Sequence, residues 1–379
     1  MAAQSLSRGR LRRLADVHPD RGRVLSVFMN LDPSELPTPA ARSSAVTSIL
    51  TEAARRVEAA QELAHDERAA LEADVERVRE VLNSDIASNG TRALAVFACQ
   101  PADLFEVVPL REPLDSRVVL DDSPYVEPLV HAGAAERWCV LLANRRVARL
   151  FTGSGDELAE TDRIVDDVHR RHEKGGWSQA NYQRSVEKEV GDHVAHTAEI
   201  TFALFKLRGF DRLLVGAPDE LVGDVEAKLH PYLRERLAGR ISCDVENSTV
   251  DQVRACAAER IEEHTRGRER EALDRLAQGV GSGGRGAAGL SAVLAALNEA
   301  RVEILLVARG LDAPGVCDPD TGLLYATPEE VPDGATAVPL PDIVEKAIER
   351  AIEQSAEVIG IRFHEDLGPL GGIGAVLRY

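Results

Sequence analysis

The sequence predicts an α/β protein made of three α/β domains in series, and three observations support this fold class. The chain has 379 residues, which is more than one compact core of ordinary size contains. Apolar runs of strand length alternate with stretches of helical periodicity along the whole chain. Hydrophobic residues make up 44% of the chain and charged residues 28%, the balance of a globular protein. We expect the domains at residues 1–132, 133–266 and 267–379.

The first domain is expected to combine strands with two long, paired helices. Residues 24–33 form a short apolar run that stops at an Asp-Pro pair, which is typical of a strand. Apolar residues then recur at three- and four-residue steps over residues 46–60 and 71–82, the period of one buried helix face. Three further apolar runs predict strands at residues 93–98, 105–110 and 117–122. We therefore expect a sheet covered by the paired helices.

The second domain is expected to contain a mixed sheet. Two apolar runs flank Asn144-Arg145-Arg146, which predicts two strands joined by a tight turn. A polar stretch without periodicity follows over residues 154–183. The rest of the domain shows a β-α-β-α pattern, for which parallel strand pairing is expected. Its elements are a helix containing residues 190–205, a strand at 211–218, a helix at 225–237, a strand at 240–245 and a helix at 250–264.

The third domain is expected to be an α/β sandwich covered by helices. A charged linker helix leads to the Gly-rich run 281–289, which predicts a loop. A helix at 290–300, a strand at 302–308 and an irregular segment to residue 333 follow. The next helix starts with Asp342 as its N-cap and carries Glu345 three residues on, and a strand at 357–363 comes after it.

Charge and composition exclude several classes of protein. The chain has 45 Lys and Arg against 63 Asp and Glu, a formal charge of −18, which argues against a generally basic nucleic-acid-binding surface. Any contact with RNA therefore requires a local basic patch. The basic first residues lead into no apolar stretch, and no run approaches the roughly 18–20 apolar residues that span a bilayer, so we expect neither a secretory signal nor a membrane segment.

The cysteines indicate a reducing compartment. There are five, an odd number, and their wide spacing suggests neither a disulfide framework nor a zinc site. We expect a cytoplasmic protein with no metal and no cofactor. The residues are Cys99, Cys139, Cys243, Cys256 and Cys317.

Residues 169–188 are the most informative segment for function. Five basic side chains face only Glu173 and Glu187, and His169 and His172 add positive charge as the pH falls. Gly175 and Gly176 lie at the centre and are followed by Trp177, Ser178 and Gln179. The basic residues are Arg170, Arg171, Lys174, Arg184 and Lys188.

This composition suits a polyanion that carries a reactive centre. Paired glycines permit a close approach of the backbone to a ligand. The side chain of Gln179 cannot act as a general base near neutral pH, but it can orient a water molecule by donating and accepting hydrogen bonds. Backbone N–H groups around the glycines can stabilise negative charge that develops on oxygen. The same pattern also fits an ordinary solvated surface loop with Trp177 as its anchor.

The other glycine-rich segments carry weaker signals. The run 281–289 lacks the Lys-Ser/Thr ending of a phosphate-binding loop and follows a helix, so we interpret it as a hinge or linker. Residues 367–374 have no helix after them and are interpreted as structural.

Several segments of the chain, taken in sequence order, resemble the archaeo-eukaryotic class of peptide-chain release factors and their Pelota, Vms-type and bacterial relatives. The hairpin WCVLLANRRVARLFTG, the loop HRRHEKGGWSQANYQR before a long helix, and DRLLVGAP resemble the central domain of that family. The segments RGAAGLSAVLAALNEARVEILLVA and GGIGAVLRY resemble its third domain, which implies a fold like that of ribosomal kink-turn-binding proteins. Together these segments cover roughly residues 135–379.

The resemblance also implies roles for individual residues. Gly176-Trp177-Ser178-Gln179 is similar to the Gly-x-x-Gln loop of the Vms-type branch, which cuts stalled nascent chains from tRNA. By this resemblance Gln179 is the catalytic glutamine, and Gly175, Gly176 and Ser178 belong to the same catalytic loop. The implied RNA-binding residues are Arg170, Arg171, His172, Lys174 and Arg184. Cleavage of the peptidyl ester and cleavage within the tRNA tail both remain open.

The implied function is that of a ribosome-associated peptidyl-tRNA hydrolase that frees nascent chains from tRNA on stalled ribosomes. The implied partners are the ribosome and peptidyl-tRNA, with a translational GTPase as a further candidate, and we expect a monomer with no membrane contact. The first domain does not resemble the stop-codon-reading domain of the family, so stop-codon decoding is not expected.

Two alternatives have no catalytic step. A protein similar to the bacterial hibernation factor Balon would occupy the ribosomal A site without needing Gln179. An RNA-binding scaffold with no link to the ribosome is the other alternative, against which the terminal GGIGAVLRY segment argues. The presence of Gln179 favours the enzyme.

Overall fold

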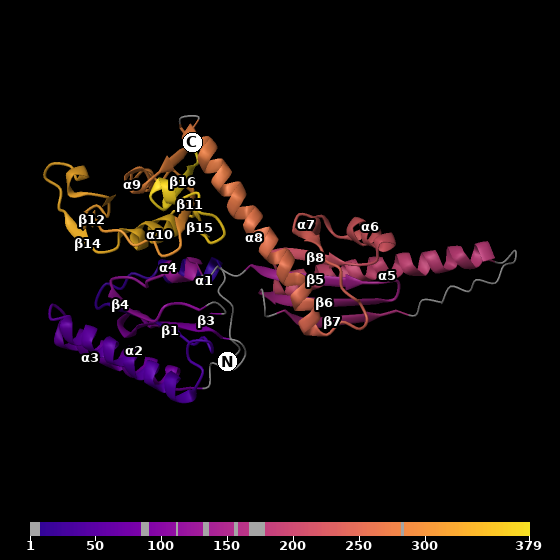
Figure 1. Ribbon diagram of the computed structural model, residues 1–379, viewed down its shortest axis with the longest axis horizontal. Coiled ribbons are helices and arrows are strands. Elements are labelled where there is room, and N and C mark those ends of the chain that lie inside the picture. The colour runs from indigo at the N-terminus through magenta and orange to yellow at the C-terminus, as the bar shows by residue number, and fades with distance from the viewer. Residues whose placement is uncertain are drawn as a thin grey trace. The chain divides into compact units, whose positions relative to one another are not determined.

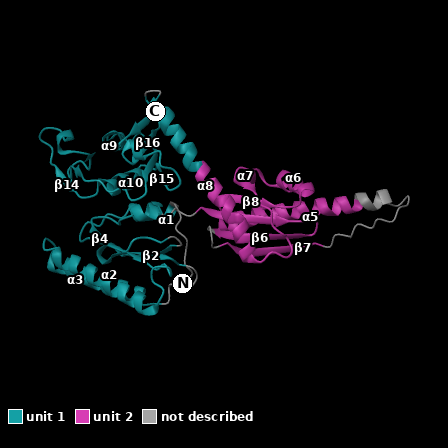
Figure 2. Cartoon of the chain, viewed as in Figure 1, with its two compact units in different colours: residues 1–134, 268–379 teal, residues 135–267 magenta. Residues whose placement is uncertain are grey.

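The computed structural model of the protein describes residues 8–84, 91–110, 113–131, 136–154, 158–166, 179–281 and 284–379. The chain divides into two compact units (Figure 2). Unit 1 contains residues 1–134 and 268–379, and unit 2 contains residues 135–267. Both units combine helices with sheets, which confirms the predicted α/β class. The domain boundaries at residues 132 and 266 stay predictions.

The N-terminal part of unit 1 is an antiparallel sheet with the strand order β3-β2-β1-β4 (Figure 1). Side chains alternate between its faces, and Leu25, Val27 and Met29 of β1 pack against α2 and α3. The paired helices thus cover one face, as the sequence predicts. The elements are β1 (Val24–Asn30), β2 (Ala93–Cys99), β3 (Leu104–Leu110), β4 (Arg117–Asp121), α2 (Pro39–Ala59) and α3 (His65–Leu82).

Local signals determine where these two helices begin. The hydroxyl of Thr38 accepts a hydrogen bond from the Ala41 main-chain N at 3.1 Å, and Pro39 occupies the first helical position of α2. At the start of α3 the Glu67 carboxylate accepts a hydrogen bond from the Ala64 main-chain N at 2.9 Å. The buried residues of α2 recur at helical spacing and are Val46, Ile49, Leu50, Ala53 and Val57.

The C-terminal part of unit 1 is a sheet with the order β10-β16-β11-β15. In this sheet β11 and β15 are parallel, whereas β16 is antiparallel to both β10 and β11. Helices α9 and α10 pack on one face, and the last part of α8 packs on the other. This arrangement confirms the predicted helix-covered sandwich. The elements are α8 (Val250–Gly281), β10 (Gly286–Ala288), α9 (Leu290–Asn298), β11 (Val302–Ala308), α10 (Ile343–Glu353), β15 (Glu357–Ile361) and β16 (Ile373–Leu377).

Two details of this part differ from the sequence prediction. The Gly-rich run predicted as a loop contains strand β10, and a Cβ added at Gly286 would lie 2.6 Å from the main-chain N of Val280. The segment predicted to be irregular contains a small antiparallel sheet of β12 (Gly315–Cys317), β13 (Leu324–Tyr325) and β14 (Val338–Leu340). These strands are too short to show a period of two.

The first and last parts of the chain share one apolar core within unit 1. Phe28 and Phe97, on the second face of the N-terminal sheet, belong to the same buried cluster as Val344 and Ile348 of α10. Leu14 of α1 (Arg8–Ala15) joins this cluster. This shared core explains why residues 268–379 form one unit with the N-terminal part.

Buried polar contacts reinforce this core. The Tyr125 hydroxyl donates to Asp342 Oδ2 at 2.9 Å, and Asp342 also caps α10 by accepting from the Val344 main-chain N at 3.0 Å, as predicted. The Glu345 carboxylate accepts from the main-chain N of Glu127 at 2.8 Å, where α4 (Glu127–His131) begins. Complete burial raises the pKa of Glu345 well above its usual range.

Unit 2 is built on a mixed sheet with the order β7-β6-β5-β8-β9, which confirms the mixed sheet that the sequence predicts. The pairs among β7, β6 and β5 are antiparallel, whereas β5, β8 and β9 are parallel. Helices α5 and α6 cover one face, and the first part of α8 covers the other. The elements are β5 (Arg137–Ala143), β6 (Val147–Ser154), β7 (Ala159–Val165), α5 (Gln179–Arg208), β8 (Arg212–Gly216), α6 (Asp219–Lys228), α7 (Pro231–Arg234) and β9 (Leu237–Arg240).

Three predictions for this unit are wrong. The helix predicted at 225–237 is split, because α6 ends at Lys228 and Pro231 starts α7. The last strand lies at β9 rather than at 240–245, since its pairing with β8 places Arg240 beside Val215. Strand β7 lies within the polar stretch 154–183, and as an edge strand it buries only Ile164, which leaves no alternating pattern to detect.

All five cysteines are free thiols, with Cys99 and Cys139 buried and the other three partly buried. Among the described residues, no helix combines the length and apolar character that crossing a membrane requires.

Candidate functional site

The predicted catalytic loop lies between β7 and α5 in unit 2, and most of it falls outside the described residues. This applies to Gly175, Gly176 and Ser178 of the predicted catalytic set. It applies equally to four predicted RNA-binding residues, Arg170, Arg171, His172 and Lys174. Gln179 and Arg184 belong to the first turns of α5, and their side chains are outside the described part.

Strand β7 before the loop and helix α5 after it are described, and a cluster of one carboxylate and two imidazoles joins them. Asp166 directly follows β7, and its main-chain N donates to the Arg146 carbonyl at 2.9 Å. Its Oδ2 lies 2.6 Å from Nδ1 of His193 and 3.2 Å from Nδ1 of His196, both on α5. The last described residue before the loop is therefore fastened to the middle of the following helix.

The two histidines occupy different environments. The side chain of His193 is fully buried, whereas that of His196 is half exposed. Nε2 of His193 is buried and has no hydrogen-bond partner among the described residues. Hydrogen bonding from His193, opposed by burial, lowers the pKa of Asp166, so the carboxylate stays ionised near neutral pH.

Helix α5 is long and begins at Gln179. The helix has 30 residues, so it is about 45 Å long. Its apolar contacts with the sheet begin at Val190, and its first turns lie beyond the sheet (Figure 1). From His193 back to Gln179 the helix rises about 21 Å, so Gln179 lies at the end of α5 that is far from the Asp166–His193 contact.

Sequence reasoning missed the Asp166–His193–His196 cluster. The two histidines are three residues apart and so share one helix face, which is the signal that was present. Their partner Asp166 lies 27 residues before His193, in a stretch that gives no secondary-structure pattern.

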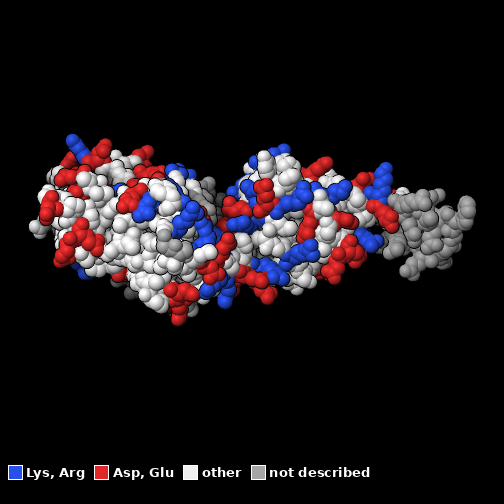
Figure 3. Space-filling view, turned by 90° about the horizontal axis from the view of Figure 1, so that it is seen from above, with Lys and Arg blue, Asp and Glu red and all other residues white. Residues whose placement is uncertain are grey.

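Three described arginines of this sheet and its hairpin turn are paired with acids. Arg146 lies 3.0 Å from Glu246, and Arg149 lies 2.6 Å from Glu160. Arg145 lies 3.4 Å from Glu220. Figure 3 likewise shows basic and acidic side chains interspersed over unit 2 on the face in view. The described surface therefore offers no uniformly basic face in this view that would replace the predicted basic loop.

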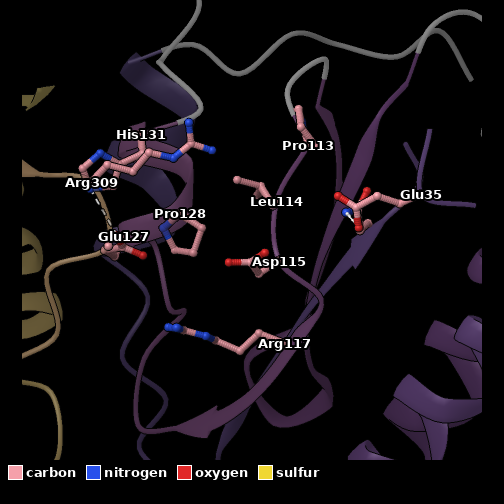
Figure 4. Close-up of a pocket in the computed structure, with 11 residues that line it drawn as sticks. Glu35, Pro113, Leu114, Asp115, Arg117, Glu127, Pro128, His131 and Arg309 are labelled. Carbon is pink, nitrogen blue, oxygen red and sulfur yellow. Dashed lines mark hydrogen bonds and ion pairs between the residues drawn. The ribbon is translucent and has the colours of Figure 1, made fainter. Parts of the chain in front are cut away.

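A cavity of about 330 Å³ lies elsewhere, in unit 1 (Figure 4). Its lining mixes acidic and basic side chains. Two of them are already engaged, since Glu35 accepts from Asn30 at 3.0 Å and Glu127 lies 3.2 Å from His131. The described residues that line it all belong to unit 1.

One family model matches the chain. It describes the bacterial archaeo-eukaryotic release factor family 10 and matches residues 124–266. This interval contains the whole sheet of unit 2, the Asp166–His193–His196 cluster and the predicted loop. No curated protein matches the chain significantly.

Solved structures of translation factors also match. An archaeal translation termination factor, aRF1, is 16% identical over 99% of both chains, with a TM-score of 0.27. Pelota from Archaeoglobus fulgidus is 17% identical over 76% of this chain and 79% of its own, with a TM-score of 0.32. Dom34 from S. cerevisiae, a translation termination-like factor, is 11% identical over 76% and 79%, with a TM-score of 0.42.

TM-scores this low do not establish a shared arrangement of the whole chain, so the assignment depends on the family match. That match covers the central domain in which the release-factor resemblance was inferred from the sequence. Residues 124–266 thus match the bacterial branch of the archaeo-eukaryotic release-factor family.

Proposed function

We propose that this protein is a ribosome-associated, cytoplasmic peptidyl-tRNA hydrolase of the Vms type that frees nascent chains from tRNA on stalled ribosomes. One observation carries the proposal. The family match at residues 124–266 encloses the sequence Gly175-Gly176-Trp177-Ser178-Gln179, at the junction of β7 and α5. In this proposal the chain acts as a monomer on peptidyl-tRNA, with a translational GTPase as a further partner.

The proposed chemistry centres on Gln179. Its amide orients the attacking group at the tRNA acceptor end, while the backbone at Gly175 and Gly176 approaches the reacting oxygen. Both cleavage of the peptidyl ester and cleavage within the tRNA tail are compatible with this role. The Asp166–His193 contact supports the proposal, since it fixes the point from which the loop departs.

The proposed RNA contacts involve the basic residues of the loop. Because Arg145, Arg146 and Arg149 are paired with glutamates, the positive charge for RNA phosphates has to come from elsewhere in unit 2. The proposed contact residues are Arg170, Arg171, His172, Lys174 and Arg184.

A release assay tests the proposal. Stalled ribosome–nascent-chain complexes are incubated with the wild-type protein, with Gln179→Ala and with Gln183→Ala, a control that removes the same side chain four residues further along α5. We expect release by the wild type and by Gln183→Ala, and loss of release with nearly intact ribosome binding for Gln179→Ala. Equal activity of Gln179→Ala and the wild type would refute the catalytic assignment.

The same experiment distinguishes the alternative without chemistry. If neither the wild type nor Gln179→Ala releases nascent chains and both sediment with vacant ribosomes, the protein is a hibernation factor that occupies the A site.

A further inference from the structure

Three potential metal ligands from distant parts of the chain meet in unit 1. They are His18, which follows α1, and Glu349 and Glu353, which lie one turn apart on α10. Nε2 of His18 lies 2.9 Å from Glu349 Oε1 and 3.6 Å from Glu353 Oε1. The three ligand atoms all lie within 4.8 Å of one another.

The second oxygen of each glutamate is held by a cation of the same helix. Lys346 Nζ donates to Glu349 Oε2 at 3.0 Å, and Arg350 Nε lies 3.4 Å from Glu353 Oε2. These contacts leave both Oε1 atoms directed at His18. Partners behind a ligand that fix its orientation are a regular feature of metal sites.

The environment of Glu349 indicates that the cluster lacks a positively charged partner for Oε1 of this residue. Its side chain is only 5% exposed, and its buried Oε1 has no hydrogen-bond partner in the part of the chain that the structure describes. The contact with His18 is close, but it does not have hydrogen-bond geometry. A buried carboxylate oxygen without a hydrogen bond is costly, so the atom requires compensation by another group.

We propose that His18, Glu349 and Glu353 bind a divalent transition-metal ion, and that this ion is Zn²⁺. One imidazole and two carboxylates form a nitrogen and oxygen donor set that zinc accepts, whereas magnesium and calcium prefer oxygen alone. Tetrahedral zinc with bonds of about 2.0–2.1 Å separates neighbouring ligand atoms by roughly 3.3 Å. The distances of 2.9 and 3.6 Å bracket this value. A water molecule takes the fourth position, because His18 is half exposed.

The ion would connect the start of the chain to the C-terminal sandwich. Helices α1 and α10 already contribute to the same apolar core, and the metal adds a polar link at its edge. Lys346 and Arg350 offset the charge of the two carboxylates, so we expect affinity weaker than that of four-ligand structural zinc sites. The proposed role is therefore stabilisation of unit 1, which is independent of the catalytic proposal.

Metal titration of the full-length protein tests this site. The protein is stripped with a chelator, reduced, and titrated with Zn²⁺ by calorimetry, and thermal unfolding is followed with and without the ion. The wild type should bind one equivalent more than His18→Ala or Glu353→Gln. Zinc should raise the unfolding temperature of the wild type by at least about 3 °C and that of either variant much less. Co²⁺ should give a visible absorption band that both variants lose.

One control and one conservative test variant make the result decisive. His65→Ala removes an exposed histidine at the start of α3 and should behave as the wild type. Glu353→Gln keeps the size of a partly exposed side chain, so folding is preserved if His18→Ala proves unstable. If the wild type binds no additional equivalent, or if both variants bind and respond to zinc as the wild type does, the cluster is an ion-pair network and the proposal is wrong.

Discussion

Nδ1 of His193 lies 2.6 Å from Oδ2 of Asp166, and this contact joins the end of β7 to the buried face of α5. The imidazole is fully buried, while the carboxylate is about one third exposed. The last described residue before the predicted catalytic loop is thus joined to the middle of the following helix by a polar contact in addition to apolar packing.

Loss of His193 should destabilise unit 2. His193→Ala removes a buried hydrogen-bonded ring, and we expect a decrease of about 1–3 kcal/mol in the free energy of unfolding. His196→Ala is the matched control, since that half-exposed ring makes the longer contact of 3.2 Å, and its cost should stay below about 1 kcal/mol. Urea unfolding of both variants measures the difference. Equal losses of unfolding free energy in the two variants would show that the buried His193 contact stabilises the unit no more than the exposed His196 contact.

The stability of unit 2 should depend on the ionisation of Asp166. Its pKa is lowered in the folded protein, so its contribution is present above the unfolded pKa and is lost as the pH falls through the folded pKa. Asp166→Asn should therefore flatten the fall in unfolding free energy below about pH 4. The effect should be modest because solvent screens the partly exposed carboxylate. Unfolding curves at a series of acidic pH values check this, and parallel profiles for the variant and the wild type would contradict it.

The Glu345 carboxylate should contribute strongly to the free energy of unfolding of unit 1. It accepts hydrogen bonds from the main-chain N atoms of Val126 and Glu127, which Glu345→Ala leaves buried without a partner. We expect a loss of about 2–4 kcal/mol in the free energy of unfolding. Glu365→Ala, at an exposed position of the same unit, should change stability by less than about 0.5 kcal/mol. Chemical denaturation distinguishes the two, and a small effect of Glu345→Ala would mean that water replaces the carboxylate.

Gly286 should not tolerate a side chain. A Cβ there would meet the backbone of Val280 at 2.6 Å, so Gly286→Ala should cost about 1–3 kcal/mol. Gly267→Ala is the control, because a Cβ at that position within α8 has no neighbour within 4 Å, and it should stabilise the helix by up to about 1 kcal/mol. Thermal unfolding should move in opposite directions for the two variants. The same direction for both would contradict the packing argument.

Reversal of the loop charge should weaken ribosome binding. Arg170→Glu together with Arg171→Glu should reduce affinity most at low salt, and the difference from the wild type should shrink as the salt concentration rises, because fewer counterions are released when phosphate contacts are lost. Each lost phosphate contact should lower the slope of log affinity against log salt by about one. Arg145→Glu, which replaces an arginine already paired with Glu220, is the control. Sedimentation at several salt concentrations measures the slopes, and an unchanged slope for the double variant would exclude these residues from the RNA contact.

Local sequence patterns were sufficient wherever a buried face repeats along the chain. The helical period of Val46, Ile49 and Leu50 predicted α2, and the apolar run after Ala93 predicted β2. The parallel pairing expected from the alternation of strands and helices occurs between β8 and β9, although β9 begins before the predicted residues. In each case the residues that determine the element are neighbours in the sequence, so the pattern can be detected without knowledge of the tertiary structure.

The sequence alone determined the α/β class, most of the helices and central strands, and the glycine-rich basic segment with Gln179. Only the tertiary structure decided the edge strand β7, the union of the first and last segments around Phe28 and Val344, and the meeting of His18 with Glu349. These features depend on contacts between residues far apart in the chain, and no local period records which distant side chains become neighbours. The physical reason is that burial of the second face of the N-terminal sheet requires a partner, and the C-terminal helices supply it.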